Sequence, residues 1–397
     1  MRPTILCLAS YEKGADFLRE CRALGCQTVL VTVDKLREAD WPREAIDEFF
    51  HMADFDNRTH VVDGVSYLAR THRFDAIVPL DEFDLELAAT LREHLRVPGL
   101  GETGVRFFRD KLAMRQRTAA AGVPVPRFTA VFNDEDVGRY LEAVAPPWVL
   151  KPRTEAAAIG IRKLAEPDAV AHWLDELGDR RSRFLLEEYV PGPVFHVDAV
   201  VVEHQVVFAA AHRYIAPPFD VAHEGGLFGS VTLEHGGPEE TELHTAHEAV
   251  MAALGLERGV FHTEFIRAPD GRFRFLETAA RVGGAHIADL VEVATGVNLW
   301  REWARLEVSR IRREKYTPPA SRADYGGLLI SLARQEWPDL ATYDDPEIAW
   351  RLKKRHHAGL AVVSDDRARV AALLDRYVER FRTDFMASMP APDRPSA

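Results

Sequence analysis

The chain has 397 residues, of which 47% are hydrophobic and 28% are charged. This length predicts two or three domains, and the composition excludes wholesale disorder and collagen-like repeats. The 62 acidic residues outnumber the 50 lysines and arginines, so the net charge is −12. Because a surface of this sign repels polyanions, we expect neither duplex nucleic acid nor an anionic membrane as a partner.

Three cysteines, Cys7, Cys21 and Cys26, lie near the N-terminus. Their odd number and spacing fit neither a disulfide framework nor a zinc site, so we interpret them as buried reduced thiols. The first apolar run is too short for a signal peptide, and no stretch reaches the ~18 apolar residues of a membrane span. These observations predict a cytoplasmic protein, and a homodimer stays open.

The first hundred residues alternate between strand-like and helix-like patterns. Thr4 to Ala9, Gln27 to Val33 and Asp75 to Leu80 are β-rich, and residues 17–24 have helical spacing. Strands separated by helices predict a parallel sheet covered on both faces, a Rossmann-like layout. The first strand-to-helix turn, residues 9–14, lacks the glycine pattern that binds a dinucleotide, so we expect no nicotinamide cofactor.

Composition and patterning predict a multidomain chain with α/β and α+β parts. A polar helix is predicted from Gly104 to Ala121, and we place the first domain boundary near residue 105. Residues 106–310 are rich in strands. Residues 311–385 combine strands with a helix and predict a small α+β cap, whereas the Pro-, Ser- and Ala-rich residues 386–397 predict a disordered tail.

Two lysines stand beside segments suited to phosphates. Lys111 lies near the start of the polar helix, and Lys151 ends an apolar strand. The small-residue loop Ala156 to Gly160, which includes Ala158, is suited to fold over phosphates with its backbone N–H groups. Taken alone, each lysine is more often a surface residue.

An apolar strand from Phe184 runs into Glu187, Glu188, Tyr189 and Val190 before a Pro-Gly turn. The segment fits an ordinary strand end. It also fits a hinge that presents backbone donors and acceptors to an adenine ring. Both interpretations stay open from these residues alone.

The residues from His262 to Glu277 predict a hairpin, because a Pro-Asp-Gly turn joins two apolar runs. The pairing brings Glu264 and Glu277 toward each other across the ladder. Facing carboxylates repel, so a cation relieves them, and oxygen ligands favour Mg²⁺ bridging nucleotide phosphates. A surface hairpin with solvated acids is the competing interpretation.

Three further residues, which follow the hairpin in the sequence, add to this pattern. Arg281 supplies a guanidinium near the predicted metal site, and Gly283 and Gly284 allow the backbone to approach a reacting oxyanion closely. The whole set, in contrast to each single motif, argues against a plain surface hairpin.

The order of these motifs resembles that of the ATP-grasp superfamily. Within it, the chain is most similar to carboxylate–amine ligases of the L-amino-acid ligase, or dipeptide synthase, type. The resemblance spans residues 1–310, with the nucleotide motifs in residues 110–284. It implies a Rossmann-like N-terminal domain (1–105), an ATP-grasp region (106–310) and a C-terminal cap.

The resemblance implies a role for each matching residue. The phosphates of ATP meet Lys111, Lys151 and the lid loop with Ala158 and Gly160. A carbonyl or carboxylate of Glu187 and a backbone N–H of Val190, within the hinge that includes Glu188 and Tyr189, meet the adenine. Mg²⁺, with Mn²⁺ as an alternative ion, is held by Glu264 and Glu277, and Arg281 holds the acyl phosphate.

Three positions depart from the family pattern. Ala279 stands where an asparagine usually binds metal, Val194 replaces an acid that binds the ribose, and His262 replaces an arginine. The first departure leaves a metal ligand to water, and the second leaves ribose recognition open.

The resemblance implies an ATP-dependent ligase that activates an amino-acid carboxylate as an acyl phosphate and joins it to an amine, releasing ADP and phosphate. His262 or His286 is a candidate base for the amine, although a packing role is commoner for either. Arg213, in a predicted loop before the glycine-rich residues 224–230, is a candidate clamp for a substrate carboxylate.

Two rival functions stay open: bicarbonate activation of the biotin carboxylase type, and nucleotide binding without catalysis. The remaining histidines carry no function in this interpretation. His196 and Asp198 are expected to form a structural pair, and we expect solvated or surface positions for His244, His247, His356 and His357.

Overall fold

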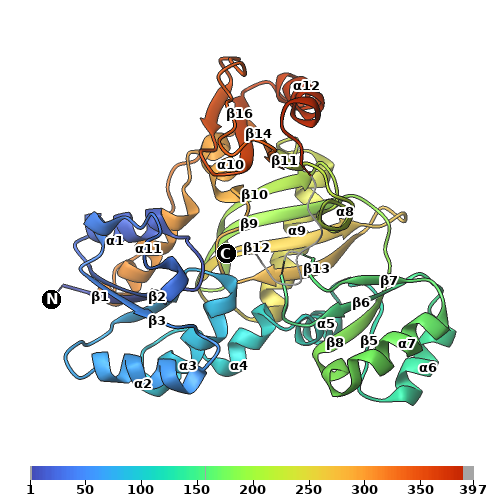
Figure 1. Ribbon diagram of the computed structural model, residues 1–397, viewed down its shortest axis with the longest axis horizontal. Coiled ribbons are helices and arrows are strands. Elements are labelled where there is room, and N and C mark those ends of the chain that lie inside the picture. The colour runs from blue at the N-terminus through green and yellow to red at the C-terminus, as the bar shows by residue number, and fades with distance from the viewer. Residues whose placement is uncertain (1, 157, 388–397) are drawn as a thin grey trace.

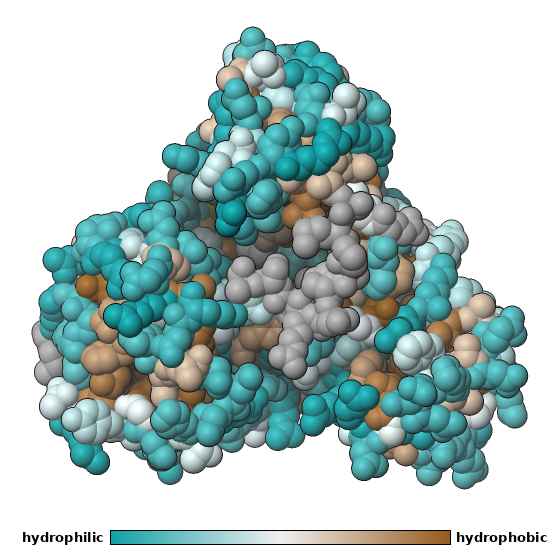
Figure 2. Space-filling model, viewed as in Figure 1, coloured by the Kyte–Doolittle hydropathy of each residue, from teal (hydrophilic) through white to brown (hydrophobic). Residues whose placement is uncertain are grey.

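The computed structural model describes residues 2–156 and 158–387, and it divides into three sheets (Figure 1). The three lobes built on these sheets meet near the middle of the molecule. Most of the surface in Figure 2 is hydrophilic, and hydrophobic residues show in the notch between the lobes. No helix within the described residues is both long and apolar enough to cross a membrane.

The N-terminal sheet is parallel, as predicted, with the strand order β3-β2-β1-β4. Alternate residues of its first strand face two different cores, so Ile5 and Cys7 pack with Phe17 whereas Leu6 and Leu8 pack with Val61. Helices therefore cover both faces. The cysteines are free and buried, as predicted. The elements are β1 (Thr4–Ala9), α1 (Ala15–Ala23), β2 (Gln27–Val33), β3 (Glu48–Met52), α2 (Arg58–Leu68), β4 (Ala76–Pro79) and α3 (Leu85–Leu95).

The predicted polar helix from Gly104 to Ala121 is wrong as a single element. It is split into α4 (Glu102–Val105), a 3₁₀ turn and α5 (Lys111–Ala120). Asp110 interrupts it, because its extended backbone lets the carboxylate accept from the N–H groups of Leu112 and Ala113 at 3.0 and 3.4 Å and cap α5.

A small antiparallel sheet follows, with the strand order β5-β8-β6-β7. Two helices cover it around the buried side chains of Trp148, Leu150 and Leu186. Its elements are β5 (Phe128–Ala130), α6 (Asp134–Ala143), β6 (Trp148–Pro152), β7 (Arg162–Leu164), α7 (Pro167–Leu177) and β8 (Phe184–Glu188).

The largest sheet has eight antiparallel strands and runs through the centre of the molecule in Figure 1. Its strands are β9 (Val194–Val202), β10 (Gln205–Tyr214), β11 (Phe228–Thr232), β12 (Gly259–Arg267), β13 (Phe273–Ala279), β14 (Tyr325–Leu332), β15 (Ile348–Arg351) and β16 (His357–Ser364). Its helices are α8 (Pro218–Glu224), α9 (Pro238–Leu254), α10 (Ile287–Thr295), α11 (Leu299–Arg312) and α12 (Arg367–Asp384).

The order β13-β12-β9-β10-β11-β14-β16-β15 shows that the C-terminal strands extend the central sheet. The predicted cap, residues 311–385, therefore shares this sheet instead of forming one of its own. Helix α11 returns to the N-terminal lobe, where Trp303 meets Phe17 at 5.6 Å between ring centroids. These crossings tie the three lobes together.

Two sequence expectations about loops are wrong. The glycine-rich residues 224–230 contain most of β11, where a Cβ on Gly229 would lie 2.9 Å from the Leu328 carbonyl oxygen of the neighbouring strand. The missing side chain allows this close pairing. The tail does not begin at residue 386, because Met386 pairs with Ala333; residues 388–397 lie outside the described part of the chain.

Candidate active site

The predicted hairpin of β12 and β13 is confirmed, and it sets Glu264 directly opposite Glu277. Gly271 adopts a left-handed backbone (φ +81°) in the turn between the strands, which glycine does without strain. Residues opposite each other in an antiparallel pair point to the same face of the sheet. The two carboxylates therefore share one face, as the sequence predicts.

One oxygen of Glu264 is held by its neighbours. The Tyr214 hydroxyl donates to Oε1 at 2.7 Å, and Nε2 of His262 lies 3.4 Å from the same oxygen. Burial alone would raise the pKa of Glu264, but His262 and Tyr214 outweigh burial and lower it. The carboxylate is therefore ionised, and no contact within the described residues uses Oε2, so the Glu264–Glu277 pair fits a divalent cation that prefers oxygen ligands.

A buried hydrogen-bond network supports His262. Asp198 accepts from His262 Nδ1 at 2.9 Å and pairs with His196 Nδ1 at 2.7 Å, and His196 Nε2 reaches the Ser230 hydroxyl at 2.7 Å. The predicted pairing of His196 with Asp198 is confirmed. His196, Asp198 and His262 lie close enough to hold a metal ion, but these hydrogen bonds already occupy their facing atoms, so we interpret the group as structural.

The charge state of His262 bears on its expected role as a base. Burial would lower its pKa, but the carboxylates of Asp198 and Glu264 outweigh burial and raise it to about 9. An imidazole that is protonated at neutral pH donates a proton and does not accept one. The predicted base role therefore does not fit this environment.

Lys111 lies between the hairpin and the predicted phosphate loop. Its Nζ is 2.5 Å from Oε2 of Glu277 and 2.6 Å from the carbonyl oxygen of Glu155. The loop residues Ala158 and Ile159, with Lys111 and Glu277, line a space of only about 20 Å³. A triphosphate needs far more room, so the loop has to open to admit one. Ala157, within this loop, lies outside the described residues.

Lys151 belongs to a buried charge cluster in the small sheet. Its Nζ is 2.5 Å from Oε2 of Glu187, and Nε of Arg115 is 2.6 Å from Oε1 of the same residue. Burial lowers the pKa of Lys151 to about 8 against the opposing pull of Glu187. Arg115 was not predicted from the sequence. The prediction that the Glu187 carboxylate contacts adenine does not fit, because Lys151 and Arg115 already bind this carboxylate.

The predicted hinge joins the small sheet to the central sheet, since it begins with the last two residues of β8 and leads toward the start of β9. Glu188 exchanges hydrogen bonds with Arg127, and the Tyr189 N–H donates to the Pro147 carbonyl at 3.0 Å. Val190 packs against the central core. This segment links two lobes, which is the position that a hinge requires.

Arg281 points from the end of the hairpin toward the N-terminal lobe. Its guanidinium pairs with Glu82 at 2.5 Å, and Glu82 also pairs with Arg109 at 2.8 Å. Burial would raise the pKa of Glu82, but Arg281, Arg109 and Lys111 outweigh it and hold the pKa far below its usual value. Glu82 was not predicted, because its partner Arg281 lies 199 residues away.

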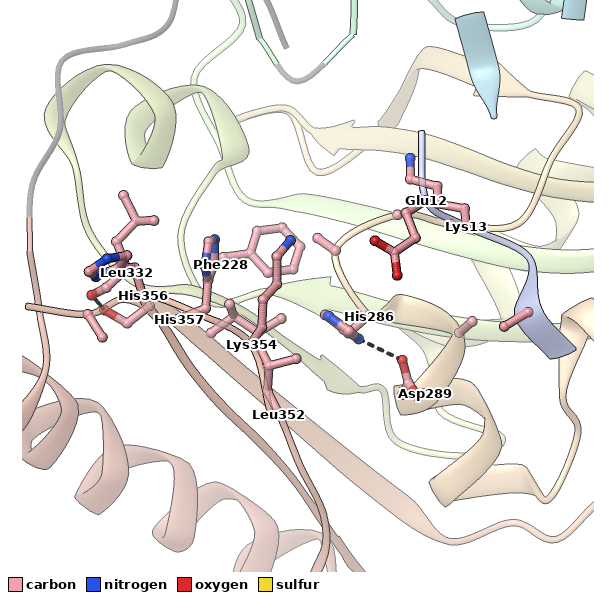
Figure 3. A pocket seen from close by; sticks show the side chains of 18 of the residues that line it. Glu12, Lys13, Phe228, His286, Asp289, Leu332, Leu352, Lys354, His356 and His357 are labelled. Atoms are coloured by element: carbon pink, nitrogen blue, oxygen red, sulfur yellow. Dashed lines mark hydrogen bonds and ion pairs between the residues drawn. The ribbon is translucent and has the colours of Figure 1, made fainter. Parts of the chain in front are cut away.

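The loop after Arg281 borders the large pocket of the molecule. Gly283, Gly284 and His286 line a cavity of about 1080 Å³ between the N-terminal lobe and the central sheet with its C-terminal strands (Figure 3). His286 pairs with Asp289 at 2.9 Å. A cavity of this size accommodates substrates as large as two amino acids.

Several sequence predictions do not fit the structure. Arg213 lies within β10 and is exposed, whereas its neighbours His212 and Tyr214 are buried on the opposite face, so it does not reach the Tyr214–Glu264 side of the sheet. His247 is wrong as a surface residue, because it is fully buried. His356 is exposed, as predicted for a solvated patch, whereas His357 is half-buried, and both also line the large cavity.

The comparison with solved structures defines the class of protein. An L-amino acid ligase from Bacillus licheniformis superposes with a TM-score of 0.76 at 17% identity, covering 97% of this chain and 98% of that one. A biotin carboxylase domain from Hydrogenobacter thermophilus, solved with MgADP and bicarbonate, gives a TM-score of 0.72 at 18% identity over 98% and 91% of the two chains. The chain therefore has the ATP-grasp fold.

Comparison of sequences adds relatives with named activities to this structural likeness. No model of a known protein family matches the chain. An L-arginine-specific L-amino acid ligase of Bacillus subtilis is 24% identical over 291 residues, which is 70% of each chain. The chain thus has the ATP-grasp fold and is similar in sequence to carboxylate–amine ligases.

Proposed function

We propose that this protein is an ATP- and Mg²⁺-dependent ligase that joins the carboxylate of an amino acid to an amine and releases ADP and phosphate. The observation that carries the proposal is the pairing of Glu264 with Glu277 beside Lys111. This site lies next to a loop that borders a cavity large enough for both substrates. The kinship with amino-acid ligases supports the choice of substrates.

The first half of the reaction makes the carboxylate reactive. A carboxylate is a poor acyl donor, and transfer of the γ-phosphoryl group of ATP to one of its oxygens converts that oxygen into a leaving group. Lys111 and Lys151 bind and neutralise the phosphates during the transfer. Glu264 and Glu277 would hold Mg²⁺, which supplies further positive charge at the phosphates.

The second half forms the amide bond. The amine attacks the carbonyl carbon, the C–O bond to the phosphate breaks, and the amine nitrogen loses a proton. Arg281 and the backbone of the Gly283–Gly284 loop stabilise the negative charge on the oxygen in the transition state. Ala158 and Gly160 would help to exclude water, which would otherwise hydrolyse the acyl phosphate.

The test is phosphate release from ATP with pairs of the twenty standard amino acids and Mg²⁺. We expect release with at least one pair, and a loss of about a hundredfold or more in Glu277→Gln, because the neutral amide holds the metal poorly. Glu142→Gln, on an exposed part of α6, is the matched control and keeps the activity.

Three results would contradict the proposal. Release that depends on bicarbonate instead of an amine indicates a carboxylase, no release with any mixture indicates a binding protein, and near-normal turnover in Glu277→Gln excludes the metal role.

A further inference from the structure

The charged groups of the large cavity are divided between its walls. Every ionisable side chain that the C-terminal strands and their connection contribute is basic, namely Lys354, His356 and His357. Figure 3 shows these residues on one side of the cavity and Glu12 and Lys13 on the other. The acidic lining residues come from the N-terminal lobe and from α10: Glu12, Asp16, Asp40, Asp289 and Glu292. Lys13 and His286 also line this wall, so acids outnumber basic groups there, and we call it the acidic wall.

Among the described residues, the C-terminal strands and their connection contribute no acidic side chain to the cavity lining, and we call this side the basic wall. In the described chain Lys354 makes no ion pair, although it lines the cavity. Burial lowers the pKa of His357, and the nearby positive charges of Lys354, His286 and His356 lower it further. Basic groups that repel one another at the wall of a cavity are stabilised by an anion.

The turn that carries these side chains is held in place. The His356 N–H donates to the Glu336 carbonyl at 2.8 Å, and the Ala333 N–H donates to the His356 carbonyl at 2.8 Å. His356 itself has a left-handed backbone (φ +55°), a conformation that needs such support in a residue with a side chain. A turn fixed in this way loses little entropy when it binds a ligand.

The charges of two amino-acid substrates match the two walls. The amino acid that is activated uses its carboxylate at the phosphate and keeps a free ammonium group, which the acidic wall attracts. The amino acid that attacks uses its nitrogen and keeps a free carboxylate, which the basic wall attracts. The cavity therefore distinguishes the two substrates by the charged group that stays free: an ammonium group on the activated amino acid and a carboxylate on the attacking one.

We propose that the turn from Lys354 to His357 binds the free carboxylate of the attacking amino acid, with Lys354 as its main contact. This inference rests on the proposed ligase function and adds the chemical class of the amine substrate. An amine without a carboxylate lacks this interaction and binds less tightly.

The experiment compares amino acids with their primary amides. The three standard amino acids that serve best as the amine are each assayed beside their amide, with the donor held at saturation. We expect Lys354→Met to raise KM for the amino acids about tenfold or more, the worth of one charge-assisted hydrogen bond, and to leave KM for the amides within about twofold. Lys354→Arg keeps the charge and restores most of the affinity.

Lys353→Met is the matched control, because Lys353 is the exposed neighbour of Lys354 and does not appear among the described lining residues. It leaves both KM values unchanged. An unchanged KM for the amino acids in Lys354→Met, or a raised KM for the donor instead, overturns this inference while the ligase function stands. No phosphate release by the wild type overturns both.

Discussion

Buried charges in the site occur in groups of alternating sign. Glu187 lies between Lys151 and Arg115, and Glu82 lies between Arg109 and Arg281. Removing one member of such a group leaves a buried charge without its partner, which costs far more than the pair contributes. The fold therefore depends on residues that also surround the proposed nucleotide site.

Arg115→Met tests this dependence. Arg115 is fully buried, and its loss leaves Glu187 with Lys151 as its remaining partner. We expect a destabilisation of about 3 kcal/mol, seen as a fall of several degrees in the thermal midpoint. Arg139→Met removes an exposed ion pair with Glu135 and changes the midpoint little. Equal effects of the two substitutions would contradict the account.

His247 gives a prediction for acid stability. Burial lowers its pKa from 6.5 to about 3, so the folded protein keeps it neutral. Its contribution to stability is complete above pH 6.5 and is lost as the pH falls toward 3, because the unfolded chain binds the proton first. At pH 5 the loss amounts to about 2 kcal/mol relative to pH 7.5.

The measurement is urea unfolding of wild type and His247→Leu at pH 7.5 and pH 5. The variant is expected to lose about 2 kcal/mol less than the wild type between the two pH values. His60→Leu, at an exposed position, is the control and follows the wild type. If His247→Leu and wild type lose the same unfolding free energy between pH 7.5 and pH 5, His247 does not cause the loss of stability in acid.

Residue-level prediction from the sequence depended on local motifs. The turn and the spacing of the apolar residues fixed the opposition of Glu264 and Glu277, because both lie on one hairpin. Arg115, Glu82 and Tyr214 carried no local signal, since each meets its partner across 50 or more residues of chain. Such partners become visible only in the folded structure.

At the scale of elements, the loop between β13 and α10 packs tightly on the buried network. A Cβ on Gly283 would lie 2.8 Å from Asp198 Oδ1 and 3.1 Å from His262 Nδ1, whereas a Cβ on Gly284 would meet nothing within 4 Å. The two glycines have the same predicted role, but only Gly284 has room for a Cβ atom.

Gly283→Ala and Gly284→Ala form a matched pair. We expect Gly283→Ala to displace the Asp198–His262 contact, to cost about 1–3 kcal/mol of stability and to lower turnover about tenfold or more. Gly284→Ala keeps wild-type stability. Thermal unfolding and phosphate release measure both effects, and a Gly284→Ala variant as unstable as Gly283→Ala would contradict this view of the loop.

Long apolar strands were predictable as elements, whereas β11 and the end of β10 were not. The β1, β2 and β8 ranges follow from short runs rich in apolar and β-branched residues. Strand β11 was missed because Gly229 reads as a loop signal, although its close contact with β14 requires a glycine. The end of β10 was missed because His212, Arg213 and Tyr214 are polar.

At the scale of the whole molecule, the site depends on contacts between lobes. Glu82 of the N-terminal lobe pairs with Arg281, the Glu155 carbonyl between β6 and β7 accepts from Lys111, and the C-terminal strands line part of the large cavity. The sequence indicated the three regions but not the continuous sheet that joins two of them, because strand pairing over this distance has no local pattern.

The central claim is that Glu264 and Glu277 hold a metal ion against the phosphates of ATP. A crystal structure with a non-hydrolysable ATP analogue and Mg²⁺ tests it most directly. We predict the triphosphate between Lys111 and Lys151, with Mg²⁺ bound by both carboxylates at about 2.1 Å. A triphosphate bound elsewhere, or a metal ion that neither carboxylate touches, would contradict the account.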